Sequence, residues 1–216
     1  MIDENHKDKI AKLLIDIESI KFEFKNPFTL TSGYKSPVYV DCRKIISYTK
    51  ERNLIINYIE KYIKNSSINF DIIAGGETAG IPYAAFLADR LQKPMIYVRK
   101  KPKGFGKNQQ IEGNFINNQK AILIEDLATD GGSKVIFVEA MRKLNIKVSD
   151  ILVIFYYNIF DISKTPLSNL NIKIHYLCSW KNIINILDQN KILQEKEIEE
   201  LKIFLNDPAK WRSIYE

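Results

Sequence analysis

Four short segments of the sequence are almost entirely apolar, and stretches with helical spacing separate them. They are residues 70–74 (FDIIA), 95–98 (MIYV), 121–124 (AILI) and 151–155 (ILVIF). Strands that are buried on both faces have this character, whereas a strand with one solvated face alternates. With helices predicted at 79–91 and 132–144, the pattern indicates an α/β domain with a central, mostly parallel sheet flanked by helices. Ligands of such sheets bind beyond the carboxyl ends of the strands.

The outer parts of the chain predict further elements. Residues 8–20 and 50–64 carry apolar stripes with the period of a helix. Between them, residues 28–42 hold β-type residues interrupted by Gly and Pro, which predicts a hairpin-like pair of short strands. Residues 198–205 predict a last amphipathic helix, ended by Asn206-Asp207-Pro208.

Composition narrows the class of protein. The chain has 216 residues, 45% hydrophobic and 27% charged, which suits one globular domain. No apolar stretch is long enough to span a bilayer, and the charged start MIDENHKDKI lacks a signal-peptide core, so we expect a cytoplasmic protein without membrane contact. Two distant cysteines, Cys42 and Cys178, argue against a disulfide framework or a cysteine metal site. A net charge of +6 fits nucleic acid, but equally a polyanionic small molecule.

The third apolar run leads into two adjacent carboxylates and a glycine turn, in the string AILIEDLATDGGS at 121–133. Glycines let the backbone approach a ligand closely, and free N–H groups at a helix start bind anions. The turn at 129–133 therefore suits a monophosphate, with Thr129 and Ser133 as hydroxyl donors. Glu125 and Asp126 suit a sugar diol or a hydrated magnesium ion. A plain strand–turn–helix is the alternative, but ionised carboxylates at the end of a buried strand need a partner.

This string resembles the PRPP-binding motif of the type I phosphoribosyltransferases. Neither a Walker loop nor a G-x-G-x-x-G turn competes with it. The matching residues are Glu125, Asp126, Leu127, Ala128, Thr129, Asp130, Gly131, Gly132 and Ser133. The first acid of the motif is usually Asp, and here it is Glu125. The resemblance implies the type I phosphoribosyltransferase fold, with PRPP as donor and a small hood over the sheet.

A basic, glycine-containing loop lies between the second and third apolar runs. Five of the nine residues at 99–107 are cationic, and two glycines and a proline preclude a long regular element. Closure of such a loop over a polyanion excludes water and strengthens charge interactions. The cations form one short loop rather than a stripe, which favours pyrophosphate over nucleic acid. The segment resembles the catalytic loop of orotate phosphoribosyltransferases, in which Arg99, Lys100 and Lys103 match.

The segment FTLTSGYKSPVYVDCR at 28–43 resembles the orotate-binding start of the same family, F-x-L-x-S-G-x-x-S-P. The resemblance implies that Thr31, Ser32 and Gly33 bind the pyrimidine together with Thr129, and that Tyr39 covers its ring. Besides Glu125, four positions depart from the family pattern, and one is Thr31, where many relatives have Lys. Ala79 stands where many relatives have Lys, Phe105 where many have His, and Asn158 roughly where an arginine holds the orotate carboxylate.

The resemblance implies a reaction and a set of partners. N1 of orotate would displace pyrophosphate from C1 of PRPP, with Mg²⁺, Arg99, Lys100 and Lys103 stabilising the leaving group and the two acids holding the ribose. Magnesium would be bound mainly through PRPP, with Glu125 and Asp126 as further ligands. The family pattern also implies a homodimer and one phosphoribosyltransferase domain over 1–216, with a hood from about residues 1–45, a core from about 46–175 and a C-terminal contribution to the hood.

Two other functions compete. A purine or uracil phosphoribosyltransferase would share the fold, but the Ser-Gly and Ser-Pro segment argues against it. A non-catalytic PRPP-sensing regulator would want a nucleic-acid-binding module, and the sequence contains no helix-turn-helix candidate with clustered base readers.

Overall fold

A six-stranded sheet forms the centre of the computed structural model, which describes residues 4–30, 33–102, 110–159, 163 and 165–213. Its strands are β5 (Ile72–Gly76), β6 (Met95–Val98), β7 (Ile111–Glu112), β8 (Lys120–Ala128), β9 (Lys147–Tyr156) and β10 (Lys173–Ser179). The order is β10-β9-β8-β5-β6-β7, and only β7 runs antiparallel to its neighbour. The four apolar runs are β5, β6, β8 and β9, so the predicted mostly parallel sheet is confirmed.

The order of the strands places a reversal of winding between β5 and β8. From β5 the chain proceeds to β6 on one side, and then returns to add β8, β9 and β10 on the other. The loops that follow β5 and β8 therefore leave the sheet edge in opposite directions and open a crevice between them. A ligand site is expected at this point.

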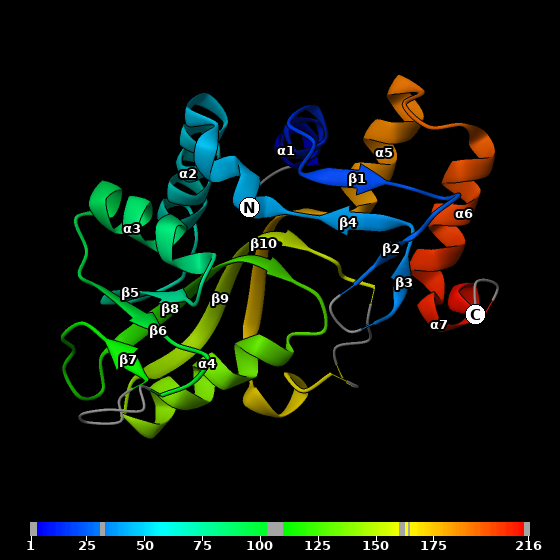
Figure 1. Cartoon of the computed structure of the whole chain (residues 1–216). Helices are drawn as coiled ribbons and strands as arrows, with labels where there is room; N and C mark the ends of the chain where they lie inside the picture. Colours follow the sequence, from blue (N-terminus) through cyan, green and yellow to red (C-terminus); the bar gives the residue numbers. More distant parts are fainter. Residues whose placement is uncertain (1–3, 31–32, 103–109, 160–162, 164, 214–216) are drawn as a thin grey trace.

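Helices cover both faces of the sheet (Figure 1). On one face, α2 (Thr49–Lys64) and α3 (Gly80–Leu91) share a buried cluster with Ile122 and Ile124 of β8. On the other, α4 (Gly132–Lys143) packs in a second cluster that contains Leu123. Successive side chains of a strand point to opposite faces, so the unbroken apolar run of β8 serves two cores.

The N-terminal segment forms a hood that shares the first of these clusters. It contains α1 (Glu4–Asp16), β1 (Ile20–Phe22), β2 (Phe28–Thr29), β3 (Lys35–Ser36), β4 (Val38–Val40) and the 3-10 helix η1 (Cys42–Ser47). Strands β2 and β3 form the predicted hairpin, whereas β4 pairs with β1. The prediction of one helix over 8–20 was wrong at its end. The chain leaves the helix at Asp16, Glu18 takes a left-handed conformation with φ 54°, and Ile20 begins a strand.

The C-terminal segment carries more structure than its sequence pattern indicated. Strand β10, the short 3-10 helix η3 (Ser168–Leu170) and helix α5 (Trp180–Asn190) were not predicted. Helix α6 (Glu195–Asn206) is not the last, because α7 (Pro208–Arg212) follows it. Both ends of this segment contact the hood. Asn182 Nδ2 donates to Asp8 Oδ1 at 3.1 Å, and Arg212 Nε donates to the Lys35 carbonyl at 3.2 Å.

Candidate active site

A cleft of about 580 Å³ opens at the carboxyl ends of the parallel strands, at the reversal between β5 and β8. The hood closes one side of it, and the carboxyl end of β8, the start of α4 and the loops after β5, β6, β8 and β9 supply the rest. The lining residues are Leu30, Tyr39, Val40, Asp41, Arg43, Glu77, Thr78, Ala79, Lys100, Glu125, Asp126, Leu127, Thr129, Ser133, Lys134 and Tyr157. Charged side chains of both signs thus share one concave surface, as expected of a site for a small polar substrate.

The predicted acidic pair lies at the base of this cleft. Glu125 is only 5% exposed, and its Oε2 accepts a hydrogen bond from Lys134 Nζ at 2.7 Å. Burial raises the pKa of the Glu125 carboxyl to about 7, and the ammonium of Lys134 opposes that shift. The buried partner that Glu125 requires is therefore Lys134, which the sequence did not reveal.

Asp126 lies next to the hood, on the cleft side of β8. Burial raises the pKa of its carboxyl, while Lys134 and Arg43 act in the opposite direction. Because neighbouring residues of a strand point to opposite faces, the two carboxylates reach different parts of the cleft. Glu125 faces the start of α4, and Asp126 faces the 3-10 helix of the hood.

The turn between β8 and α4 has the geometry of an anion site. Gly131 adopts a left-handed conformation with φ 85°, and no side chain caps α4 from that position. The Asp130 carboxylate instead accepts the Gly132 N–H at 3.1 Å and the Thr129 hydroxyl at 3.2 Å. These donors are the groups that a monophosphate would use at a helix start.

The described ends of the basic loop are held together. The Arg99 N–H donates to the Gln110 carbonyl at 2.8 Å, and Gln110 Nε2 donates back to the Arg99 carbonyl at 2.8 Å. Glu77 anchors the same end, because its Oε2 accepts the Lys100 N–H at 2.7 Å and its Oε1 lies 3.8 Å from Arg99 Nη2. Lys100 lines the cleft. Lys103 and Phe105 lie outside the described residues.

The hood contributes an aromatic ring and a cation. Tyr39 lines the cleft and is 36% exposed, with its ring centroid 5.8 Å from that of Phe28. Arg43 donates through Nη2 to the Tyr39 hydroxyl at 3.1 Å and through Nε to Asp41 Oδ1 at 2.6 Å. Gly33 turns the β2–β3 hairpin with φ 84° and is not part of the cleft lining. Thr31 and Ser32, predicted to bind the pyrimidine, are not among the described residues.

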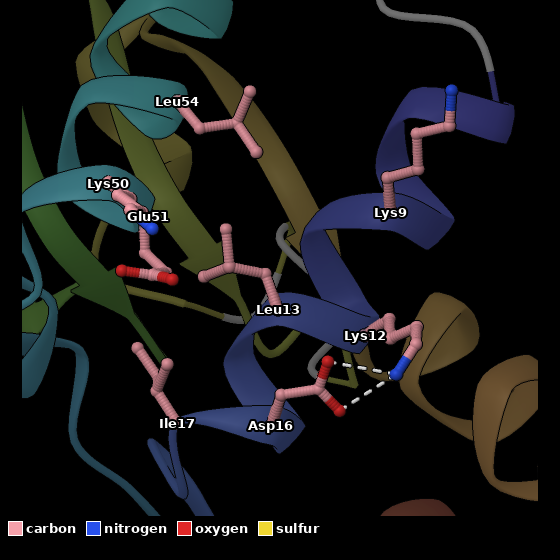
Figure 2. Close-up of a pocket in the computed structure, with 8 residues that line it drawn as sticks. All are labelled: Lys9, Lys12, Leu13, Asp16, Ile17, Lys50, Glu51 and Leu54. Carbon is pink, nitrogen blue, oxygen red and sulfur yellow. Dashed lines mark hydrogen bonds and ion pairs between the residues drawn. The ribbon is translucent and has the colours of Figure 1, made fainter.

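A second hollow lies between α1 and the start of α2 and shares no residue with the cleft (Figure 2). Its rim carries the exposed ion pair of Lys12 and Asp16 at 2.8 Å, and Leu13 and Leu54 point into it. None of the predicted site residues that the structure describes lies there.

Comparison with known proteins decides the family. Residues 47–181 match the phosphoribosyl transferase domain family. The chain is 42% identical over 204 residues to the orotate phosphoribosyltransferase of Rhizobium rhizogenes, covering 94% of this chain and 88% of the relative. The relative of the same name from Agrobacterium fabrum gives the same identity and coverage. The chain belongs to the orotate phosphoribosyltransferase family.

Solved structures agree with this family and with the phosphoribosyltransferase fold. The orotate phosphoribosyltransferase of Aeropyrum pernix superposes with a TM-score of 0.71 at 25% identity, over 86% of this chain and 99% of that one. The UMP synthase of Leishmania donovani gives a TM-score of 0.77 at 25% identity, over 94% of this chain and 42% of that longer one. None of the helices in the described part of this chain combines the length and apolar character that crossing a bilayer requires.

Within this orotate phosphoribosyltransferase fold, the structure gathers only part of the predicted residues at the cleft wall. The predicted residues that line it are Lys100, Glu125, Asp126, Leu127, Thr129, Ser133 and Tyr39. Five predicted residues lie in backbone that flanks the lining: Arg99, Gly33, Asp130, Gly131 and Gly132. Ala128 is buried in the second core cluster.

Sequence reasoning missed six lining residues with polar side chains: Asp41, Arg43, Glu77, Thr78, Lys134 and Tyr157. Lys134 was hidden because a lysine in the first turn of an amphipathic helix is usually solvated. The signal for Lys134 in the sequence is the need of the Glu125 carboxylate for a partner, which a protein cation satisfies as well as a ligand does. Tyr157 directly follows β9, at the same sheet edge as the acids, and that position was its only signal.

Proposed function

We propose that this chain transfers the 5-phosphoribosyl group of PRPP to N1 of orotate, giving orotidine 5-monophosphate and pyrophosphate, a step of pyrimidine biosynthesis. The observation that carries the proposal is the cleft at the β5–β8 reversal. There an acidic pair adjoins a helix start with hydroxyl donors, in a chain 42% identical to proteins named for this reaction.

Each part of PRPP has a matching group in the cleft. The 5-phosphate is assigned to the turn at 129–133 and the ribose diol to Glu125 and Asp126. The pyrophosphate is assigned to Lys100 together with Arg99 and Lys103. As the C1–O bond breaks, its electron pair leaves with pyrophosphate, and preorganised cations stabilise the charge that develops there. N1 of orotate supplies the electron pair of the new N1–C1 bond, and the N1 proton is released to solvent. The enzyme otherwise acts by holding N1 and C1 in line.

The acceptor is assigned to the hood side of the cleft. Tyr39 offers a partly exposed ring for the pyrimidine to stack on, with backbone contacts from the segment at 31–33 and with Thr129. Orotate carries a carboxylate, and Asn158 cannot supply a charge for it. We assign that role to Arg43, whose guanidinium lies beside the Tyr39 hydroxyl. Arginine is suited to planar recognition of a carboxylate.

Magnesium fits this cleft as an ion shared with substrate. Among the described residues, no group of three or more His, Cys, Asp and Glu side chains is placed to hold a metal. Mg²⁺ commonly takes one or two carboxylates plus substrate phosphates and waters, and Glu125 and Asp126 provide that number. When bound, the ion would neutralise charge on the pyrophosphate group. We also propose that the protein is a cytoplasmic homodimer. Light scattering tests the oligomeric state.

The test is turnover on a panel of bases. Purified protein is mixed with PRPP and Mg²⁺, with orotate, uracil, hypoxanthine or adenine added separately, and pyrophosphate release is followed. We expect turnover with orotate alone, and its loss in Asp126→Asn. Turnover on another base but not orotate would replace the proposal with a different phosphoribosyltransferase. Binding of PRPP without turnover on any base would favour the regulator.

A further inference from the structure

The two carboxylate oxygens of Glu125 have different surroundings. Oε2 accepts the 2.7 Å hydrogen bond from Lys134 Nζ. Oε1 is buried and has no hydrogen-bond partner within the part of the chain that the structure describes. An unpaired buried acceptor is costly, so a donor from outside this set of residues is expected at Oε1. Glu125 lines the cleft, which is where such a donor would arrive.

Lys134 connects this carboxylate to the start of α4. It lies in the first turn of that helix, is 5% exposed, and also donates to Ser133 Oγ at 3.2 Å. Two of its three N–H groups are therefore engaged inside the protein. One ammonium thus joins the acid that ends β8 to a hydroxyl of the proposed phosphate turn.

Two glycines on the other side fix where Oε1 lies. A side chain at Gly76, the last residue of β5, or at Gly80, the first of α3, would collide with Glu125 Oε1. The carboxylate therefore lies against the backbone of the β5–α3 connection, and Lys134 holds it from the α4 side. The β5–α3 connection and the start of α4 together set the position of one oxygen atom of Glu125.

We propose that Lys134 is a positioning residue. It holds Glu125 through Oε2, so that Oε1 keeps its position beside the β5–α3 connection, where a hydroxyl of the ribose of PRPP supplies the missing donor. This inference rests on the proposed function in that it assigns a ribose phosphate to the cleft. We assign Lys134 to Glu125 and not to phosphate, because its side chain is 6% exposed and two of its three donors are engaged by Glu125 and Ser133.

The first test compares two ligands by calorimetry in the absence of Mg²⁺: ribose 5-phosphate, which carries the diol, and pyrophosphate, which does not. In Lys134→Met, ribose 5-phosphate affinity should fall about 10- to 100-fold, the typical effect of a charge-assisted hydrogen bond. Pyrophosphate affinity should stay within about threefold, since a change below 1 kcal/mol means that no strong contact was lost. Lys143→Met, an exposed position in the last turn of α4, is the matched control.

The second test is a double-mutant cycle that combines Lys134→Met with Glu125→Gln. Lys134→Met alone leaves the buried Glu125 carboxylate without its cation, and the double variant removes that charge if the single variant folds poorly. If Lys134 acts through Glu125, adding Lys134→Met to Glu125→Gln should change ribose 5-phosphate affinity less than twofold, about the error of additive behaviour. Lys134→Arg should retain most of the affinity. In steady state, kcat/KM for PRPP should fall with the binding loss while KM for orotate is preserved.

Three results would overturn the inference. They are unchanged ribose 5-phosphate affinity in Lys134→Met, an equal or larger loss of pyrophosphate affinity, and additive effects in the cycle. These results are separable from failure of the proposed function. A protein that binds ribose 5-phosphate through Glu125 and Lys134 but never uses orotate would reject the acceptor and leave this inference standing.

Discussion

The hydroxyl of Tyr83 donates a 2.6 Å hydrogen bond to the carbonyl oxygen of Cys42, and this bond fixes the hood against the core. Tyr83 belongs to α3 and is fully buried, as is Cys42 at the start of η1. The residues on either side of Cys42, Asp41 and Arg43, line the cleft. A contact in the interior thus determines how the hood presents its polar groups to substrate.

Tyr83→Phe removes this bond and leaves a buried carbonyl unpaired. The free energy of unfolding should fall by about 1–3 kcal/mol, the cost of an unsatisfied buried polar group. Urea denaturation should show a lower midpoint with an unchanged slope. Tyr48→Phe, at a position 41% exposed, should change the same quantity by less than about 0.5 kcal/mol. Equal midpoints for the two variants would show that the bond does not stabilise the fold.

Arg43→Gln should raise the KM for orotate about 10-fold or more, because a charge-assisted contact to the orotate carboxylate is lost. The KM for PRPP should change little. Arg90→Gln, an exposed arginine of α3 that donates to Asn57, is the control and should leave both constants unchanged. An unaltered orotate KM in Arg43→Gln would mean that another group holds the carboxylate.

Lys103→Ala should lower kcat about 10²- to 10³-fold, as expected when a donor that stabilises developing charge is removed. This prediction rests on the sequence of the basic loop, since Lys103 lies outside the described residues. A loop residue contributes little to folding, so the melting temperature should not change. Lys120→Ala, at the amino end of β8 and opposite the cleft, is the control for charge. A melting temperature that falls in step with kcat would reject the loop assignment.

Asp130→Asn should increase affinity for ribose 5-phosphate several-fold at low salt. The Asp130 carboxylate occupies the donors of Thr129 and Gly132, and its charge repels an incoming phosphate. Asparagine keeps an acceptor for the helix start and so should preserve stability to within about 0.5 kcal/mol. The gain measured by calorimetry should shrink as salt rises, because screening reduces the repulsion. Weaker binding in the variant would instead assign Asp130 a direct favourable role.

Local patterns in the sequence were sufficient for most of the α/β core. Strands β5, β6, β8 and β9 were predicted because a strand covered on both faces must be apolar along its whole length. Strand β10 was not predicted, because it lies at the edge of the sheet and its apolar run is interrupted by Lys173, His175 and Tyr176. His175 is nonetheless buried, with Tyr62 Oη 2.6 Å from its Nδ1 and Asp150 Oδ1 2.7 Å from its Nε2, and no local pattern anticipates partners that distant.

By itself, the sequence determined the four inner strands of the sheet, the acidic pair at the end of β8 and the glycine turn that follows, because burial and backbone conformation act between near neighbours along the chain. Only the tertiary structure decided that Lys134 is the partner of Glu125, that Arg43 enters the cleft from the hood, and that Gly76 and Gly80 make room for a carboxylate. Those relationships depend on how a strand, a helix and the hood pack together in space, not on the local pattern of the sequence. The charge of a side chain shows that it needs a partner, but only packing selects which one.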